Sequence, residues 1–159
     1  MKKLLAFLLL ISFASYGQKK PSLNYVIIPF GINTPYLFPA DSKNATLTKT
    51  DIAEIEKLLK TSISDYNKHQ KEEAQKKGIA KGSPGENDLL IDLRQYKRQF
   101  VAILNDKKEK EVWVNCLCET DGEDWRNKPI THDGGGKCYF YLKMNLTLHK
   151  YSFLAVNGQ

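Results

Sequence analysis

The hydrophobic residues follow a helical period in one segment of the chain and a strand period after it. Over residues 52–66, apolar side chains recur at spacings of three and four, with charged residues on the opposite side. Just before them, Thr48 followed by Asp51 is a capping-box pattern, which is typical of a helix N-terminus. We therefore expect one amphipathic helix over about 49–70, with fraying up to Lys77.

Beyond residue 95 the apolar positions take on the two-residue alternation of β-strands. Residues 105–109 read as a polar hairpin turn, and residues 119–136 as a long polar loop. That loop ends in three glycines at 134–136, which allow a turn with positive φ. The segments between these turns are predicted strands of an antiparallel meander. They span residues 96–104, 111–118, 137–147 and 151–156.

A helix followed by a meander predicts an α+β fold, because a sheet with an apolar face needs a cover. We expect one long amphipathic helix packed on a four- to five-stranded antiparallel meander sheet. The additional strand is a short edge strand over 25–28, since Pro29 and Pro35 interrupt the apolar run there. Residues 18–47 are then an N-terminal extended segment, and residues 48–159 form a single α+β domain.

Residues 1–17 have the three-part pattern of a secretory signal peptide. Lys2 and Lys3 precede an apolar run, and small residues lead to a cleavage site between Gly17 and Gln18. The run of about 11 apolar residues is shorter than the roughly 20 that a spanning helix needs. No cysteine follows it for a lipid anchor. We therefore expect a soluble, secreted or periplasmic product without membrane insertion after cleavage.

Two resemblances accompany this pattern. The first rests on three strings, Tyr-Lys-Arg-Gln-Phe-Val-Ala (96–102), Val-Trp-Val-Asn-Cys (112–116) and Asp-Gly-Gly-Gly-Lys-Cys-Tyr-Phe (133–140). These strings are similar to small uncharacterised secreted proteins of Bacteroidota, which implies export and no particular activity. The predicted order β-α-β-β-β-β resembles the cystatin-like arrangement. The inhibitory hairpin of true cystatins, of the Gln-Val-Val-Ala-Gly type, is absent from the sequence.

The charge balance argues against a nucleic-acid partner. The whole chain has a formal net charge of +6. Without the two lysines of the signal peptide, 22 basic residues face 18 acidic ones, which leaves a net charge of +4. Lys68, Lys71 and Lys76 interleave with Glu72 and Glu73, as on a solvated helix face. A nucleic-acid surface would instead gather basic and aromatic residues on one side.

The three cysteines suit a structural crosslink in an oxidising compartment. If the strands that flank the long loop pair symmetrically, Cys118 faces Cys138 and Cys116 faces Phe140. A Cys118–Cys138 disulfide would hold the loop at its base, and Cys116 would be a buried apolar residue. Pairing through Cys116, or three reduced cysteines in the core, remain alternatives.

The same cysteines offer a sharper chemical alternative, a secreted metal-binding protein or a cysteine-dependent enzyme. Two thiols at spacing two, a third across the hairpin and a loop imidazole have the ligand types of a tetrahedral zinc site, although Cys-x-Cys on a strand is not the usual spacing. Cys138, His132 and Asp133 contain the residue types of a cysteine hydrolase. These readings centre on Cys116, Cys118, His132 and Cys138.

The acidic residues of the long loop are the remaining candidate for a metal site. The acidic residues do not match an EF-hand spacing, so a solvated loop is favoured over a calcium site. They are Glu119, Asp121, Glu123, Asp124 and Asp133. We therefore expect no metal, no cofactor and no catalytic residue, with enzymatic activity left open but less favoured.

The strongest binding candidate is the sheet face that the helix leaves open. Alternation places aromatic, amide and ammonium groups there, which suits a protein, peptide or glycan partner. These residues are Trp113, Asn115, Tyr139, Tyr141 and Lys143. Trp125, near the tip of the long loop, is a second candidate. The alternative is that the apolar segment 25–38 covers this face itself. The pattern thus favours a small exported, non-catalytic binding module, with an accessory role in an envelope assembly as a further possibility.

Overall fold

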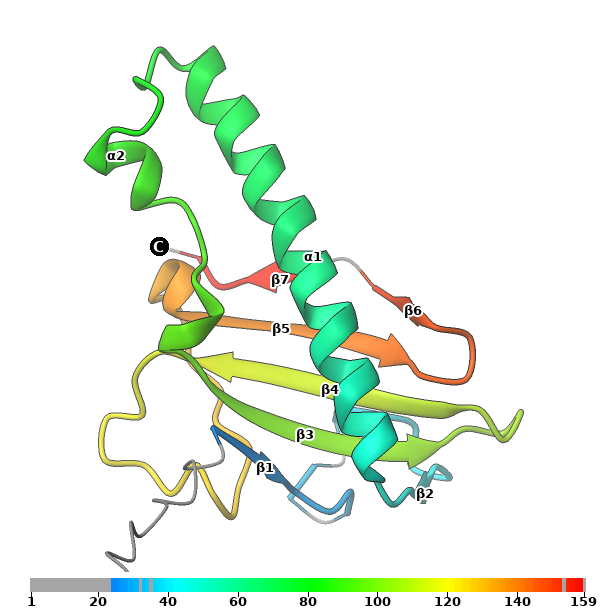
Figure 1. Cartoon of the computed structure of the whole chain (residues 1–159). Helices are drawn as coiled ribbons and strands as arrows, with labels where there is room; N and C mark the ends of the chain where they lie inside the picture. The colour runs from blue at the N-terminus through cyan, green and yellow to red at the C-terminus, as the bar shows by residue number, and fades with distance from the viewer. Residues whose placement is uncertain (1–23, 32, 35, 153, 159) are drawn as a thin grey trace, which may run out of the picture.

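The helix α1 (Lys49–Lys76) lies across one face of a mixed β-sheet, which makes the fold α+β (Figure 1). The computed structural model describes residues 24–31, 33–34, 36–152 and 154–158. The predicted signal peptide and the stretch up to residue 23 lie outside these residues. The C-terminal part of α1 extends past the edge of the sheet, beside the short helix α2 (Pro84–Asn87) (Figure 1).

The start of α1 follows from its capping box. The Thr48 hydroxyl accepts a hydrogen bond from the Asp51 backbone N–H at 3.2 Å, and the Asp51 carboxylate accepts one from the Thr48 N–H at 2.8 Å. The helix continues past residue 70, and its second half contacts the rest of the fold through hydrogen bonds and a buried side chain. The Asn67 side-chain amide bonds both the N–H and the C=O of Ile91, at 2.8 and 2.9 Å. Ala74 is fully buried.

Three antiparallel strands form the centre of the sheet, as the alternation predicts. β3 (Lys97–Leu104), β4 (Lys110–Leu117) and β5 (Tyr139–Asn145) pair along their length. Trp113 lies opposite Val101 on one side and Lys143 on the other. The hairpin turn between β3 and β4 is also confirmed.

The sheet is nevertheless not a four- to five-stranded antiparallel meander: it has seven strands and is mixed. β1 (Tyr25–Ile27) pairs with β3 in parallel, with Val26 opposite Gln99. Because the connection from β1 to β3 contains the whole of α1, the chain crosses back and both strands run the same way. β2 (Lys43–Asn44) then pairs antiparallel with the other end of β3.

The predicted last strand over 151–156 is two short strands. β6 (Lys150–Tyr151) pairs with one end of β5, and β7 (Ala155–Val156) pairs with the other end. Between them Ser152 donates its N–H to the Lys143 carbonyl at 2.8 Å and accepts the Lys143 N–H through its hydroxyl at 3.0 Å. A side chain thus replaces one backbone acceptor, and the regular ladder is interrupted there.

Each face of the sheet carries its own apolar cluster. Beneath α1, side chains from the helix and the central strands form the larger cluster, which includes Ile55, Leu59, Phe100, Val114, Phe140 and Leu142. On the opposite face, the N-terminal segment packs Ile28, Phe30, Leu37 and Phe38 against Val101, Ile103 and Trp113. The Asn44 amide fastens this segment, because it donates to the Phe30 carbonyl and accepts from the Phe30 N–H, both at 2.6 Å.

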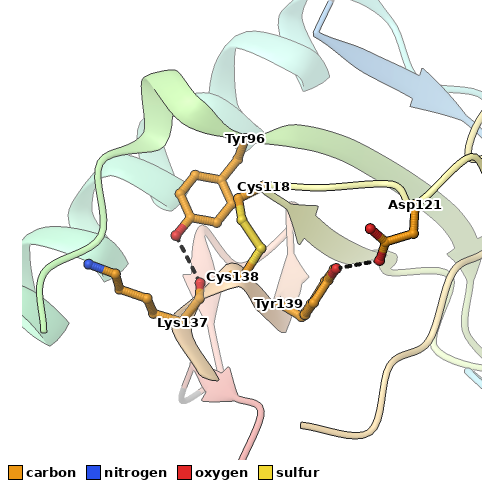
Figure 2. The surroundings of a disulfide bond; sticks show 6 residues. All are labelled: Tyr96, Cys118, Asp121, Lys137, Cys138 and Tyr139. Carbon is orange, nitrogen blue, oxygen red and sulfur yellow. Dashed lines mark hydrogen bonds between the residues drawn. A yellow bond between two sulfur atoms is a disulfide. The ribbon is translucent and has the colours of Figure 1, made fainter. Parts of the chain in front are cut away.

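The predicted disulfide between Cys118 and Cys138 is present (Figure 2). It joins the end of β4 to the short 3-10 turn before β5, and the two Cα atoms are 5.0 Å apart. Cys116 is free, fully buried beneath α1 and opposite Phe140, as the pairing predicts. Beside the disulfide, the Tyr96 hydroxyl donates to the Lys137 carbonyl at 2.8 Å (Figure 2).

The disulfide closes a loop with a sequence separation of 20 and should therefore stabilise the fold. We expect the double substitution Cys118→Ala/Cys138→Ala to lower the free energy of unfolding by about 3 kcal/mol, measured by urea denaturation. Reduction of the unsubstituted protein should give a similar loss. The Cys118→Ala/Cys138→Ala variant should itself be insensitive to reductant. Equal midpoints for the oxidised protein and the double variant would contradict a stabilising role.

Candidate functional site

A pocket of about 350 Å³ lies on the sheet face opposite α1. Its floor comes from β4 and β5, and its walls come from the N-terminal segment, the loop over 119–135 and the C-terminal residues. The lining residues are Tyr36, Leu37, Trp113, Asn115, Leu117, Ile130, Thr131, His132, Tyr139, Tyr141, Lys143 and Asn157. Its volume is within the range of small-ligand sites.

The strand alternation explains the floor of the pocket. Trp113, Asn115 and Leu117 occupy alternate positions of β4, and their side chains share the face that α1 does not cover. The register places Tyr141 opposite Asn115 and Tyr139 opposite Leu117. The structure therefore brings together the five strand residues that the sequence predicts for a binding face. They are Trp113, Asn115, Tyr139, Tyr141 and Lys143.

This face is less open than the pattern suggests, because the N-terminal segment covers part of it. Trp113 and Asn115 are only 3% and 5% exposed, and Leu37 and Phe38 belong to the same apolar cluster as Trp113. Tyr141 remains 43% exposed. The N-terminal segment thus covers the β3 side of the face, and the β5 side is left as a pocket.

Trp125, expected near an exposed loop tip, is buried instead and does not line the pocket. It belongs to a small apolar cluster with Leu117, Ile130 and Tyr139. The Lys97 ammonium and the Arg126 guanidinium lie 5.3 and 4.8 Å from its ring centre. Its large apolar ring explains the difference, because burial against the sheet removes that surface from water.

The loop wall is held by the side chain of Gln99, which is fully buried in β3. Its amide nitrogen donates to the carbonyls of Trp125 and Lys128, at 2.6 and 2.7 Å. Its amide oxygen accepts from the Ile130 N–H at 2.9 Å and from the Asn115 amide at 3.0 Å. One side chain therefore satisfies three backbone groups of a segment that forms no strand.

Asn115 extends this network into the pocket. Its side-chain nitrogen donates to Gln99 and also to the Ile130 carbonyl, the latter at 2.8 Å. Both amide hydrogens are thereby used. Its side-chain oxygen has no hydrogen-bond partner within the part of the chain that the structure describes, so it is left as an acceptor in the pocket lining.

Gly135 allows the Tyr139 ring to form the end of the pocket. Its φ is +80°, and a Cβ at this position would lie 2.6 Å from the Tyr139 ring. The predicted positive φ of all three glycines at 134–136 is confirmed. The His132 ring stacks on Tyr139 with ring centres 4.0 Å apart, and the Asn157 amide donates to the His132 carbonyl at 2.5 Å. Burial and the hydrogen bond to Asp121 raise the pKa of the Tyr139 hydroxyl (Figure 2).

Lys143 closes the opposite wall. Its ammonium group donates to the Leu37 carbonyl at 2.6 Å and lies 4.7 Å from the centre of the Phe38 ring. This contact fastens the N-terminal segment to β5. No ion pair among the described residues includes Lys143, so its charge has no carboxylate partner there.

The structure does not bring the four residues of the zinc or cysteine-enzyme interpretation together. Cys118 and Cys138 are joined as a disulfide, so neither is a thiolate. Burial raises the pKa of the Cys116 thiol, which lies beneath α1. His132 is part of the pocket on the other face, with its Nε2 3.4 Å from a Glu123 oxygen. Among the described residues, no group of three or more His, Cys, Asp or Glu side chains is arranged to hold a metal ion.

Within the described part of the chain, no helix combines the length and apolar character needed to cross a membrane. No protein-family model, curated protein or solved structure matches the chain.

The sequence pattern misses the walls of the pocket. Tyr36, Thr131 and Asn157 come from segments without regular structure. In such segments no helical or strand period predicts which way a side chain points. Gln99 carried a usable signal, because it is an uncharged polar residue next to the apolar run of a central strand. Such a residue is normally buried only with hydrogen-bond partners.

Removal of the Gln99 amide should loosen the loop wall. We expect Gln99→Leu to lower the free energy of unfolding by about 2–4 kcal/mol, because three backbone groups and Asn115 lose a buried partner. Hydrogen exchange at Ile130 should accelerate. Gln95→Leu, at an exposed position, is the matched control and should change neither quantity appreciably. Unchanged exchange at Ile130 in Gln99→Leu would refute this role.

Gly135 and Gly122 form a matched pair for the pocket end, because both have positive φ but only Gly135 faces a nearby ring. We expect Gly122→Ala to cost about 1 kcal/mol from backbone strain alone. Gly135→Ala should cost about 1–3 kcal/mol more, since Tyr139 must move. Urea denaturation measures both losses, and NMR shifts of the His132 ring report the move of Tyr139. Equal losses with an unshifted His132 would show that the close approach does not matter.

Proposed function

We propose that this protein is a small exported, non-catalytic binding module whose ligand occupies the pocket between β4, β5 and the loop wall. The observation that carries the proposal is the exposure of two aromatic side chains at one cavity. Tyr36 and Tyr141 are 62% and 43% exposed, and both line the pocket. Exposed aromatic surface that borders a cavity is the common property of recognition sites.

The rigidity of the surroundings supports binding by a preformed site. The Gln99 and Asn115 amides hold the loop wall, the Lys143–Leu37 contact holds the opposite wall, and the disulfide joins the ends of the loop. A ligand that enters such a pocket orders few additional groups, which favours affinity.

The cysteines do not favour the alternative of a cysteine enzyme. A catalytic cysteine needs a thiolate that a substrate can reach. Two of the three sulfurs are in a disulfide, and the third is completely buried with a raised pKa. The pocket itself contains one imidazole, that of His132, whose ring is stacked on Tyr139.

Export to a secreted or periplasmic location is part of the proposal. Residues 1–17 supply the signal-peptide pattern, and a disulfide is a typical feature of proteins in oxidising compartments. The predicted cystatin-like element order implies no inhibitory activity, because the hairpin motif of true cystatins is absent from the sequence.

A fragment screen by NMR tests the proposal. We expect fragments that bind to shift the side-chain amide signals of Asn115 and Asn157, because both line the pocket. Tyr141→Ala should weaken these hits about tenfold, since a half-exposed ring supplies much of the apolar contact area. Leu148→Ala is the matched control, because Leu148 lies in the β5–β6 turn and is 48% exposed, against 43% for Tyr141. This variant should bind the same fragments with unchanged affinity.

The same screen can overturn the proposal. Hits that scatter over the surface, or that shift neither amide, would exclude the pocket as the binding site. The free energies of unfolding of Tyr141→Ala and Leu148→Ala must match that of the unsubstituted protein within about 1 kcal/mol, as expected for exposed positions.

A further inference from the structure

We infer that the ligand of this pocket is a neutral saccharide, with one face of a sugar ring lying on the exposed aromatic side chains. The inference rests on the proposed function and names a ligand class for the same site. It follows from three properties of the lining taken together: open aromatic rings, unused hydrogen-bond acceptors and the absence of carboxylates.

The aromatic rings offer a fixed apolar platform. The Tyr141 ring leans on Trp113, with ring centres 6.3 Å apart, and Trp113 is itself buried in the apolar cluster beneath the N-terminal segment. The face of an aromatic ring is partly negative. A pyranose presents several C–H groups on one side, which are apolar and partly positive, so it matches this surface. Tyr36 adds a second exposed ring at the same pocket.

The lining retains hydrogen-bonding groups without a partner, and several of them are acceptors. The Asn115 amide donates to two oxygens, and the Asn157 amide donates to the His132 carbonyl, which fixes the orientation of both side chains. Their side-chain oxygens, and the Thr131 hydroxyl, have no partner in the described part of the chain. Amide oxygens accept from hydroxyl groups. Sugar hydroxyls supply such donors at every position of the ring.

The charge in the pocket lining disfavours a cationic ligand, and the free side-chain oxygens disfavour an anionic one. Among the described residues, no carboxylate and no arginine lines the cavity. The Lys143 ammonium lies in the wall and disfavours a cation. An anion would meet the Lys143 ammonium, which keeps two N–H groups beyond its bond to Leu37, but it would also meet the free oxygens of Asn115 and Asn157, which repel it.

A glycan array and a library of unmodified peptides, followed by titration of the hits in solution, test the inference with the full mature chain. The array should contain neutral, sialylated, sulfated and free-amine glycans. We expect binding to neutral glycans, weakened about tenfold or more by Tyr141→Ala because the stacking surface is lost. Tyr141→Phe keeps the ring and should stay within about threefold of the unsubstituted protein. Thr131→Val, which removes a hydroxyl at constant volume, should weaken binding about threefold to tenfold.

The controls separate the ligand class from the site. Leu148→Ala should bind as the unsubstituted protein does, and all variants should keep its unfolding midpoint. Binding restricted to charged glycans, or to peptides, with the same dependence on Tyr141 would overturn the saccharide inference and leave the proposed function standing. If neither library yields a ligand whose binding depends on Tyr141, the saccharide inference fails, and the fragment screen alone decides the proposed function.

Discussion

The pocket depends on one buried amide, that of Gln99. The loop between β4 and β5 forms no strand, and its backbone groups around Trp125, Lys128 and Ile130 would lie against an apolar sheet without partners. A buried unpaired group costs about 1–3 kcal/mol, so without the amide the loop would be better placed in water. Gln99 satisfies three such groups and the Asn115 amide at once. These hydrogen bonds hold the long polar loop against the sheet, where it forms one wall of the pocket.

The two faces of the sheet are covered in different ways, and the pocket results from that difference. Beneath α1, one continuous helix lies across the sheet, and the contact is filled by side chains of both elements. On the other face, two irregular segments together cover the sheet. The N-terminal segment covers the β3 side with Leu37 and Phe38, and the loop covers the ends of β4 and β5. The pocket is the space between these two covers, and Tyr141 is exposed because neither reaches it.

Local spacing predicted the elements that depend on local physics. The capping box of α1, the three central strands and the facing of Cys118 and Cys138 all follow from alternation and from capping chemistry. The parallel pairing of β1 with β3 did not follow, because the pairing partner of a three-residue strand is set by where the helical crossover leaves the chain. For the site, alternation assigned the strand residues to one face. It gave no information on Tyr36 or on the burial of Trp125, since these residues lie in irregular segments whose path is set by tertiary contacts.

The loop wall is restrained at three separate points, and this bears on how a ligand would bind. The disulfide fixes its two ends, the Gln99 and Asn115 amides fix its middle, and the Asn157 amide fixes it at His132. A segment held at one end only would retain many conformations and would have to lose them on binding. Restraint at three points removes most of that freedom during folding. The loop has therefore already lost this conformational entropy in the folded protein, and ligand binding costs little more. The contact area of an exposed ring such as Tyr141 then contributes to affinity with little offset from ordering the loop.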